Sequence, residues 1–391
     1  MSKTVILASA RTPVGKMGGG LSTLQATELG GVAIGAALER AGVEPEQVDH
    51  VVMGQVLQAG QGQIPSRQAQ IKAGIPKEVS SETVNKVCAS GLRASVIIDQ
   101  AIRAGDMQVG VGGGMESMSK APYLLPQARF GYRMGDAQML DAMVHDGLTN
   151  PFSGKQMFVE ATAVADEFEM TRADLDRWAL RSHERALAAI DEGRMAEEIV
   201  PVSVNGRKQS TVVEIDEGPR RDTSLERLAA LPGLVGKDGS HTAGNSPGVN
   251  DGAGALVLAS EEWASANGKE ALAEIVAHAQ SANDFAYLAT TPASAAKKAL
   301  EKAGLQPGDI DLWEINEAFA SVTLNSIRML GIDEQRVNVN GGAVALGHPI
   351  GASGARILGS LVLELRRRGG GLGCAAICSG GGQGDALILK V

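Results

Sequence analysis

Short apolar runs alternate with longer amphipathic segments along much of the chain. Runs near residues 4–10 and 51–53 predict β-strands. Apolar residues at helical spacing predict helices near 27–41, from just after Cys88 to Gly105, and from just after Gly351 to Gly369. Each of these helices ends at a glycine, which is typical of a helix C-terminus. The alternation predicts an α/β fold with a mainly parallel sheet covered by helices.

The same pattern occurs twice. Residues 37–49, ALERAGVEPEQVD, return at 299–311 as ALEKAGLQPGDID. At nearly the same spacing, Cys88-Ala89-Ser90-Gly91 aligns with Gly351-Ala352-Ser353-Gly354. Such self-similarity predicts a duplicated fold, and the cysteine occurs in one copy only.

The middle of the chain has no counterpart in the repeat. We therefore divide the chain into a first half, 1–120, which about 251–270 completes, an inserted region, 121–250, and a second half, 271–391. Thr171-Arg172-Ala173-Asp174 resembles a capping box and predicts a helix that runs to Gly193.

Composition narrows the class of protein. A chain of 391 residues is long enough for two or three domains, and its net charge of −9 argues against general nucleic-acid binding. The first apolar run is too short for a signal peptide, and no uncharged stretch predicts a membrane span. Three cysteines, Cys88, Cys374 and Cys378, fit a reducing compartment. We expect a soluble, cytoplasmic protein.

Two residues at the matching helix starts could carry chemistry. Cys88 precedes one predicted helix, where free N–H groups would lower the pKa of a thiol. His348 lies among glycines just before the matching helix of the second copy, and a nearby histidine can activate a cysteine. A small buried cysteine and a helix-capping histidine are the alternatives. The other histidines look exposed or incidental: His50, His145, His183, His241 and His278.

Further candidates follow strands of the second copy. Cys378 precedes Ser-Gly-Gly-Gly at a strand end, where its thiol would face a cleft, whereas Cys374 looks like a packing residue. Asn316 lies where a strand passes into a helix and could orient a water molecule. The sequence shows no nucleotide-binding glycine fingerprint, no phosphate-binding loop motif and no zinc-ligand spacing. We expect no metal.

Together these segments resemble the thiolase family. The likeness begins at Ala10-Arg11-Thr12-Pro13, and its other motifs are 84–91, 113–119, 316–319, 347–351 and 378–382. The resemblance implies a duplicated thiolase fold, in which two βαβαβ halves stack as five αβαβα layers. The inserted loop domain would cover the coenzyme A site.

The resemblance also implies a reaction. Two acetyl-CoA molecules would be joined to acetoacetyl-CoA and free CoA, or the reverse, within fatty acid metabolism. Cys88 would take the acyl group, His348 would activate it and help to hold an oxyanion, and Cys378 would move protons. One oxyanion site would use His348 and a water molecule held by Asn316, and the other the amides of Cys88 and Gly380. Acyl-CoA and CoA are then substrates, and no cofactor is expected.

Other positions are expected to bind coenzyme A. Arg220 resembles a family residue near the adenine nucleotide. Met157, Ala318 and Phe319 resemble residues of the pantetheine and acyl pocket. The chain departs from the biosynthetic branch at Gln156, where histidine is usual, and at 245–248, where Ser246 is the candidate replacement for a pantetheine-contacting serine. Residues 129–136 resemble the tetramer-forming loop, which implies a homotetramer of paired dimers.

Three other functions remain open at this point. One is a degradative 3-ketoacyl-CoA thiolase of broader chain length. More distant is a decarboxylating ketoacyl synthase, which shares the duplicated fold but resembles a Cys-His-His set. The last is a non-catalytic acyl-CoA carrier, which would have lost its catalytic residues.

Overall fold

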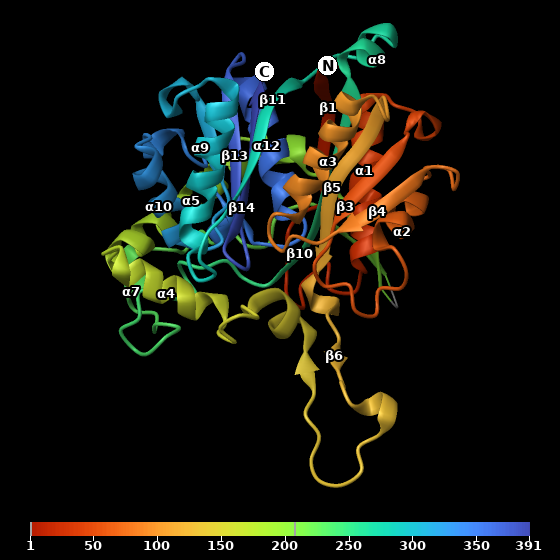
Figure 1. The fold of residues 1–391 in the computed structure, drawn as a ribbon. Coiled ribbons are helices and arrows are strands. Elements are labelled where there is room, and N and C mark those ends of the chain that lie inside the picture. The colour runs from red at the N-terminus through yellow and green to blue at the C-terminus, as the bar shows by residue number, and fades with distance from the viewer. Residues whose placement is uncertain (1, 207–208) are drawn as a thin grey trace.

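The computed structural model describes residues 2–206 and 209–391. Two half-domains lie side by side, each built on strands of one continuous sheet (Figure 1). The first half supplies β1 (Thr4–Arg11), β3 (His50–Gly54), β4 (Ser80–Val84), β5 (Val109–Ser117) and β10 (Asn250–Ser260), with the short β2 (Gly15–Lys16) beside β10. The second supplies β11 (Ala273–Ala282), β12 (Leu312–Ile315), β13 (Leu372–Ser379) and β14 (Gln383–Lys390). Only two residue pairs, Val5 with Glu274 and Ile6 with Ala273, join β1 to β11.

The sheet is mixed, so the prediction of a mainly parallel sheet is wrong. The strand β3 is parallel to β4 and β5, and β12 is parallel to β13. In contrast, β10 is antiparallel to β1, β2 and β5, and β14 is antiparallel to β11 and β13. The connection explains the direction of β14, because a tight turn joins it to β13 and can join only antiparallel neighbours. The long connection through the inserted region fixes no direction for β10.

The helices form three layers around the two half-sheets. On the outer faces lie α1 (Ala26–Ala41) with α2 (Pro65–Lys72) and α9 (Thr291–Ala303) with α10 (Ala320–Leu330). Between the halves lie α3 (Ser90–Ala104) and α12 (Ser353–Arg367), which contact each other and strands of both halves. The predicted helices and the five αβαβα layers are thereby confirmed.

The two central helices meet at a pair of repeated glycines. A Cβ on Gly91 would lie 2.8 Å from the backbone nitrogen of Ala355, and one on Gly354 would lie 2.2 Å from that of Leu92. Larger residues would therefore push α3 and α12 apart. Because Cys88 and His348 lie just before these helices, the close contact also brings their loops together.

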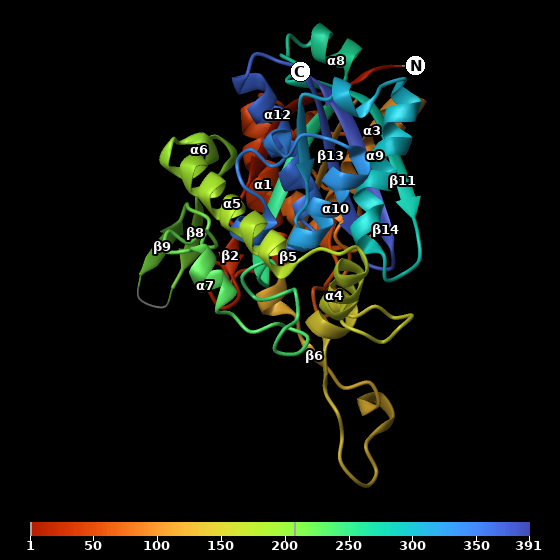
Figure 2. The same ribbon diagram turned by 90° about the vertical axis from the view of Figure 1, so that its left-hand side faces the viewer.

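The inserted region packs along one side and the lower edge of the molecule. Its helices are α4 (Met157–Glu167), α5 (Arg172–Asp191), α6 (Arg194–Glu198) and α7 (Leu225–Ala229), and its strands β8 (Val202–Asn205) and β9 (Ser210–Val213) form a small sheet. Figure 2 shows α5, α6 and α7 on one side, with β8 and β9 beside them. The Thr171 capping box is confirmed, because the Thr171 hydroxyl accepts the Asp174 N–H and the Asp174 carboxylate accepts the Thr171 N–H, both at 3.2 Å.

A long hairpin-like segment projects from the body (Figure 1). It is bounded by β6 (Tyr123–Leu124) and β7 (Leu140–Asp141) and points away from both termini. The remaining helices are α8 (Glu261–Ala266), α11 (Ala343–Leu346) and the π-helical turn Met143–Leu148, with short 3₁₀ turns at Pro45–Gln47, Met118–Lys120, Ala128–Phe130, Leu288–Thr290, Pro307–Asp309 and Glu334–Arg336. Among residues 2–206 and 209–391, no helix combines the length and apolar character needed to cross a membrane.

Candidate active site

A narrow cavity of about 160 Å³ lies where the two halves and the inserted region meet. Most of the residues predicted for the site line it: Cys88, Met157, Ser246, Ala318, Phe319, His348, Cys378 and Gly380. Segments from both copies of the repeat therefore contribute to one site.

The loop that carries Cys88 holds a strained turn. Val87 has φ of 43°, which is unfavourable for a β-branched residue. The side chain of Asn85 accepts the Val87 N–H at 2.9 Å, and the Ser90 hydroxyl accepts the Lys86 N–H at 2.8 Å. These contacts fix the backbone immediately before Cys88, so the thiol occupies a defined position.

The loop that carries His348 is held by Asn250. The His348 N–H donates to Asn250 Oδ1 at 2.9 Å, and Gly347 adopts φ of 109° directly against the Asn250 side chain. On the ring, Nδ1 lies 2.6 Å from the Ser353 hydroxyl. Nε2 is buried and has no hydrogen-bond partner among the described residues, so it is available to a group in the cavity.

Burial, rather than the helix start, controls the ionisation of the two thiols. Burial raises the pKa of Cys88 to about 12, although the N–H groups of Cys88 and Gly380 act in the opposite direction. Burial also raises the pKa of Cys378 well above its usual value, and the nearby Cys88 adds to this rise. The prediction of a lowered pKa at Cys88 is wrong, because the loss of hydration outweighs the nearby N–H groups.

The histidine is also neutral at rest. Burial, with a smaller contribution from the positive charge of Arg356, lowers the pKa of His348 to about 3. A neutral imidazole therefore faces neutral thiols, and a proton must move when Cys88 reacts.

Asn316 and Arg220 lie outside the wall of the narrow cavity. Asn316 follows β12 and is fully buried, and neither atom of its side-chain amide has a hydrogen-bond partner in the part of the chain that the structure describes. A buried amide of this kind can be satisfied by an ordered water molecule. Arg220 lines a second, wider hollow.

Comparisons with known proteins assign the family. Residues 4–262 match the thiolase N-terminal domain, and residues 269–391 match the thiolase C-terminal domain. The chain belongs to the thiolase family. Curated relatives include acetyl-CoA acetyltransferases of Cupriavidus necator and Escherichia coli, each 48% identical to this chain. Each match covers 100% of this chain, with 100% of the Cupriavidus necator protein and 99% of the Escherichia coli protein. Its structure is similar to the crystal structure of the Bacillus anthracis acetyl-CoA acetyltransferase, with a TM-score of 0.98 and 41% identity over 100% of this chain and 99% of the other.

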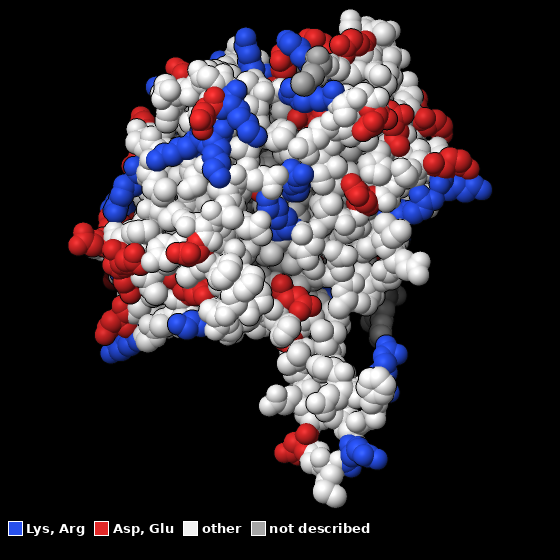
Figure 3. Space-filling view, in the orientation of Figure 1, with Lys and Arg blue, Asp and Glu red and all other residues white. Residues whose placement is uncertain are grey.

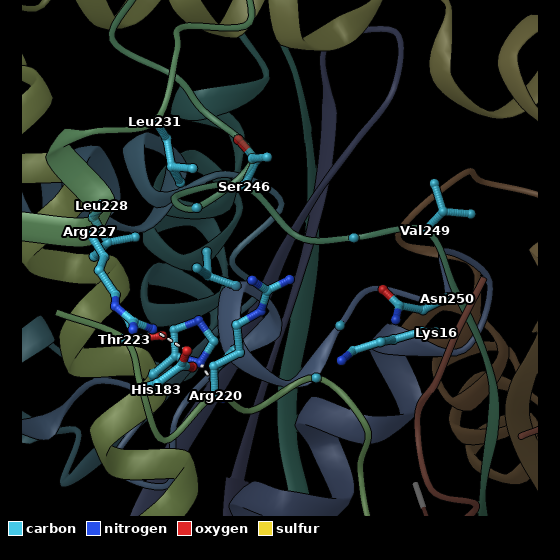
Figure 4. Close-up of a pocket in the computed structure, with 18 of the residues that line it drawn as sticks. Lys16, His183, Arg220, Thr223, Arg227, Leu228, Leu231, Ser246, Val249 and Asn250 are labelled. Carbon is cyan, nitrogen blue, oxygen red and sulfur yellow. Dashed lines mark hydrogen bonds and ion pairs between the residues drawn. The ribbon is translucent and has the colours of Figure 1, made fainter. Parts of the chain in front are cut away.

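The wider hollow of this thiolase, of about 520 Å³, adjoins the narrow cavity (Figure 4). Ser246, Gly248 and Val249 line both spaces. Figure 4 shows the side chains of Arg220 and Lys16 extending into the hollow. The Ser246 hydroxyl is buried and lacks a hydrogen-bond partner among the described residues, so it can bind a polar group at the junction.

Sequence reasoning missed several residues around these spaces. Lys16, His183 and Arg227 also line the wider hollow. His183 is buried and accepts the Arg220 N–H at 3.2 Å, so its description as exposed or incidental is wrong. His241 is fully buried as well, and its ring meets that of Phe319 edge-on at 5.3 Å. Nothing in the local sequence distinguishes these histidines, because distant segments bury them.

Two buried glutamates connect the site to its surroundings. Glu116 accepts the N–H groups of Val56, Leu57 and Gly351 at 3.0–3.1 Å, which joins β5 to the start of α12. Glu317 lies next to Asn316 and accepts four hydrogen bonds, two from α5 and two from the segment 338–344. Both residues lie within the motifs that carried the resemblance, yet their partners could not be inferred from the sequence.

Proposed function

We propose that this thiolase is an acetyl-CoA C-acetyltransferase. The observation that carries the proposal is the presence of two thiols and a partner-free imidazole nitrogen in one small, largely apolar cavity. The adjoining hollow, with Arg220 and Lys16 extending into it, is suited to the phosphorylated end of coenzyme A. The names of the full-length relatives support the same activity.

The first half-reaction transfers an acetyl group to Cys88. The sulfur attacks the thioester carbonyl of acetyl-CoA while its proton passes to Nε2 of His348. The carbon–sulfur bond to CoA then breaks, and the departing sulfur receives a proton. Because the pKa of His348 is low, the imidazolium passes this proton on readily.

The second half-reaction forms a carbon–carbon bond. The Cys378 thiol first gives its proton to Nε2 of His348, and the resulting thiolate removes an α-proton from a second acetyl-CoA. The carbanion formed in this way attacks the carbonyl of acetyl-Cys88. Acetoacetyl-CoA leaves, and the Cys88 sulfur regains a proton from the His348 imidazolium. Negative charge develops on a different thioester oxygen in each half-reaction. The N–H groups of Cys88 and Gly380 would hold one such oxygen, and His348 with a water molecule on Asn316 would hold the other.

The size of the cavity favours short acyl groups. Met157 and Phe319 are among the residues that line a space of only about 160 Å³. We therefore expect thiolysis of acetoacetyl-CoA to be faster than that of longer 3-ketoacyl-CoAs. Equal rates on longer chains would instead support the degradative thiolase. Release of carbon dioxide from a malonyl thioester would support a ketoacyl synthase, and binding of acetyl-CoA without turnover would support a carrier.

No cofactor is needed for these steps, since they use only a nucleophile and acid–base groups. Activity should therefore survive dialysis against a metal chelator. Loss of activity that a divalent metal restores would contradict this part of the proposal.

We also propose that the protein is a cytoplasmic homotetramer of paired dimers. Support comes from the projecting segment between β6 and β7, where Phe130 and Met134 are 92% and 98% exposed. Figure 3 shows charged side chains near the end of this segment and along one side, with an uncharged surface between them. Large apolar side chains in such exposed positions are suited to contact with another subunit. Light scattering should give the mass of four chains, and replacing both residues with serine should leave dimers.

A further inference from the structure

The duplicated motif repeats a serine as well as a glycine. Ser90 and Ser353 occupy equivalent places in the two copies, and each is the first residue of a central helix, α3 or α12. Both are fully buried, and each hydroxyl reaches back to the loop that precedes its helix. The repeat therefore conserves a contact as well as a fold.

In the first copy the Ser90 hydroxyl binds only backbone groups among the residues that the structure describes. The Ser90 hydroxyl accepts the Lys86 N–H and donates to the Val87 carbonyl at 2.6 Å. It thus closes the strained turn before Cys88.

In the second copy the equivalent hydroxyl, that of Ser353, contacts the imidazole ring of His348. Ser353 Oγ lies 3.0 Å from the Pro349 carbonyl and 2.6 Å from Nδ1 of His348. It is the only hydrogen-bond partner of the ring among the described residues. The serine that holds the backbone beside Cys88 therefore has a counterpart that holds the side chain of His348.

We propose that Ser353 is a positioning residue that orients the His348 ring in both of its protonation roles. This inference rests on the proposed function, in which Nε2 acts first as a base and later as a hydrogen-bond donor. A hydroxyl can accept from Nδ1–H while its own hydrogen lies on the Pro349 carbonyl, and it can also donate to a bare Nδ1. A carboxylate could only accept, and it would also stabilise the imidazolium. No proton has to pass through Ser353.

The test compares two serine variants of α12. Ser353→Ala removes the contact with His348, whereas Ser360→Ala removes another buried hydroxyl, which donates to Glu198 at 2.9 Å. For purified full-length protein we would measure the rate of Cys88 acetylation by acetyl-CoA, kcat and KM for thiolysis of acetoacetyl-CoA, and the melting temperature. Ser353→Ala should lower the acetylation rate and kcat about 10-fold with KM within about twofold. Ser360→Ala should leave the acetylation rate, kcat and KM each within about twofold of the wild-type value.

Two outcomes would overturn the inference. One is a Ser353→Ala variant that acetylates Cys88 as fast as Ser360→Ala, or that changes only KM. The other is a folded Ser353→Thr variant, which keeps the hydroxyl, with as large a loss as Ser353→Ala. If the wild-type protein itself forms no acetyl-Cys88, the proposed function fails instead, so the two failures can be told apart.

Discussion

The substitution Glu317→Gln tests how the inserted region is joined to the residues around the site. Glu317 is buried, and its Oε1 accepts from Trp178 Nε1 at 2.9 Å and from Asn338 Nδ2 at 3.0 Å. Its Oε2 accepts from Ser182 Oγ at 2.7 Å and from the Val344 N–H at 3.0 Å. One carboxylate therefore ties α5 to the segment that leads to α11, directly beside Asn316.

The magnitude follows from the four donors. Glutamine replaces one oxygen by an NH₂ group, which the Ser182 hydroxyl can accept but the Trp178, Asn338 and Val344 N–H groups cannot. At least one N–H donor therefore faces another donor whichever way the amide is turned, and the remaining hydrogen bonds lose the strength that a carboxylate gives them. Each buried donor left without an acceptor costs about 1–3 kcal/mol. Removing the buried charge offsets part of this cost, and we expect the free energy of unfolding to fall by about 3 kcal/mol in total. Unfolding entropy of about 2.1 cal/mol/K per residue over 391 residues converts this loss to a fall of about 4 °C in the melting temperature.

Calorimetry of Glu317→Gln beside Glu301→Gln checks this reasoning. Glu301 lies on α9 with an exposed side chain, so its variant should melt within about 1 °C of the wild-type protein. A Glu317→Gln protein that also melts within about 1 °C would show that the four hydrogen bonds do not hold the inserted region in place.

Three further predictions follow from the same structure. Burial raises the pKa of Cys88 to about 12, so the rate of its alkylation by iodoacetamide in the free protein should rise continuously from about pH 7 to 10. A rate that reaches a plateau below about pH 8 would contradict a neutral resting thiol. Arg11→Met would leave the buried carboxylates of Glu198 and Asp216 without their shared cation. We expect the free energy of unfolding, measured in urea, to fall by about 3–5 kcal/mol, and an unchanged unfolding midpoint would refute this. Cys378→Ser should still acetylate Cys88 but fail to form acetoacetyl-CoA, and equal loss of both half-reactions would argue against separate roles for the thiols.

Much of the architecture could be predicted because its signals are local and repeated. Glycines end α1, α3 and α9, and the repeated Ser-Gly pair marks the start of both central helices. The direction of β10 was not predictable, because its neighbours lie more than a hundred residues away in the chain.

The same distinction applies to the site. Cys88, His348 and Cys378 stand out because each lies beside glycines at the end of a helix or strand. Their ionisation was mispredicted at Cys88, since hydration depends on atoms from the whole fold and the helix start is only one influence. The partners of Glu116 and Glu317 come from segments far apart in the sequence, so neither role could be inferred before the structure.

The central claim is that the two copies of the repeat share one active site, with Cys88 from the first and His348 from the second. The most direct test is peptide mass spectrometry of Cys88 after brief mixing with acetyl-CoA, for the wild-type protein and for His348→Ala. The account predicts a labile acetyl group on Cys88 of the wild-type protein and acetylation at least about 100-fold slower in a folded His348→Ala protein. Acetylation of Cys88 at the wild-type rate without His348, or no acetyl group on Cys88 at all, would contradict it.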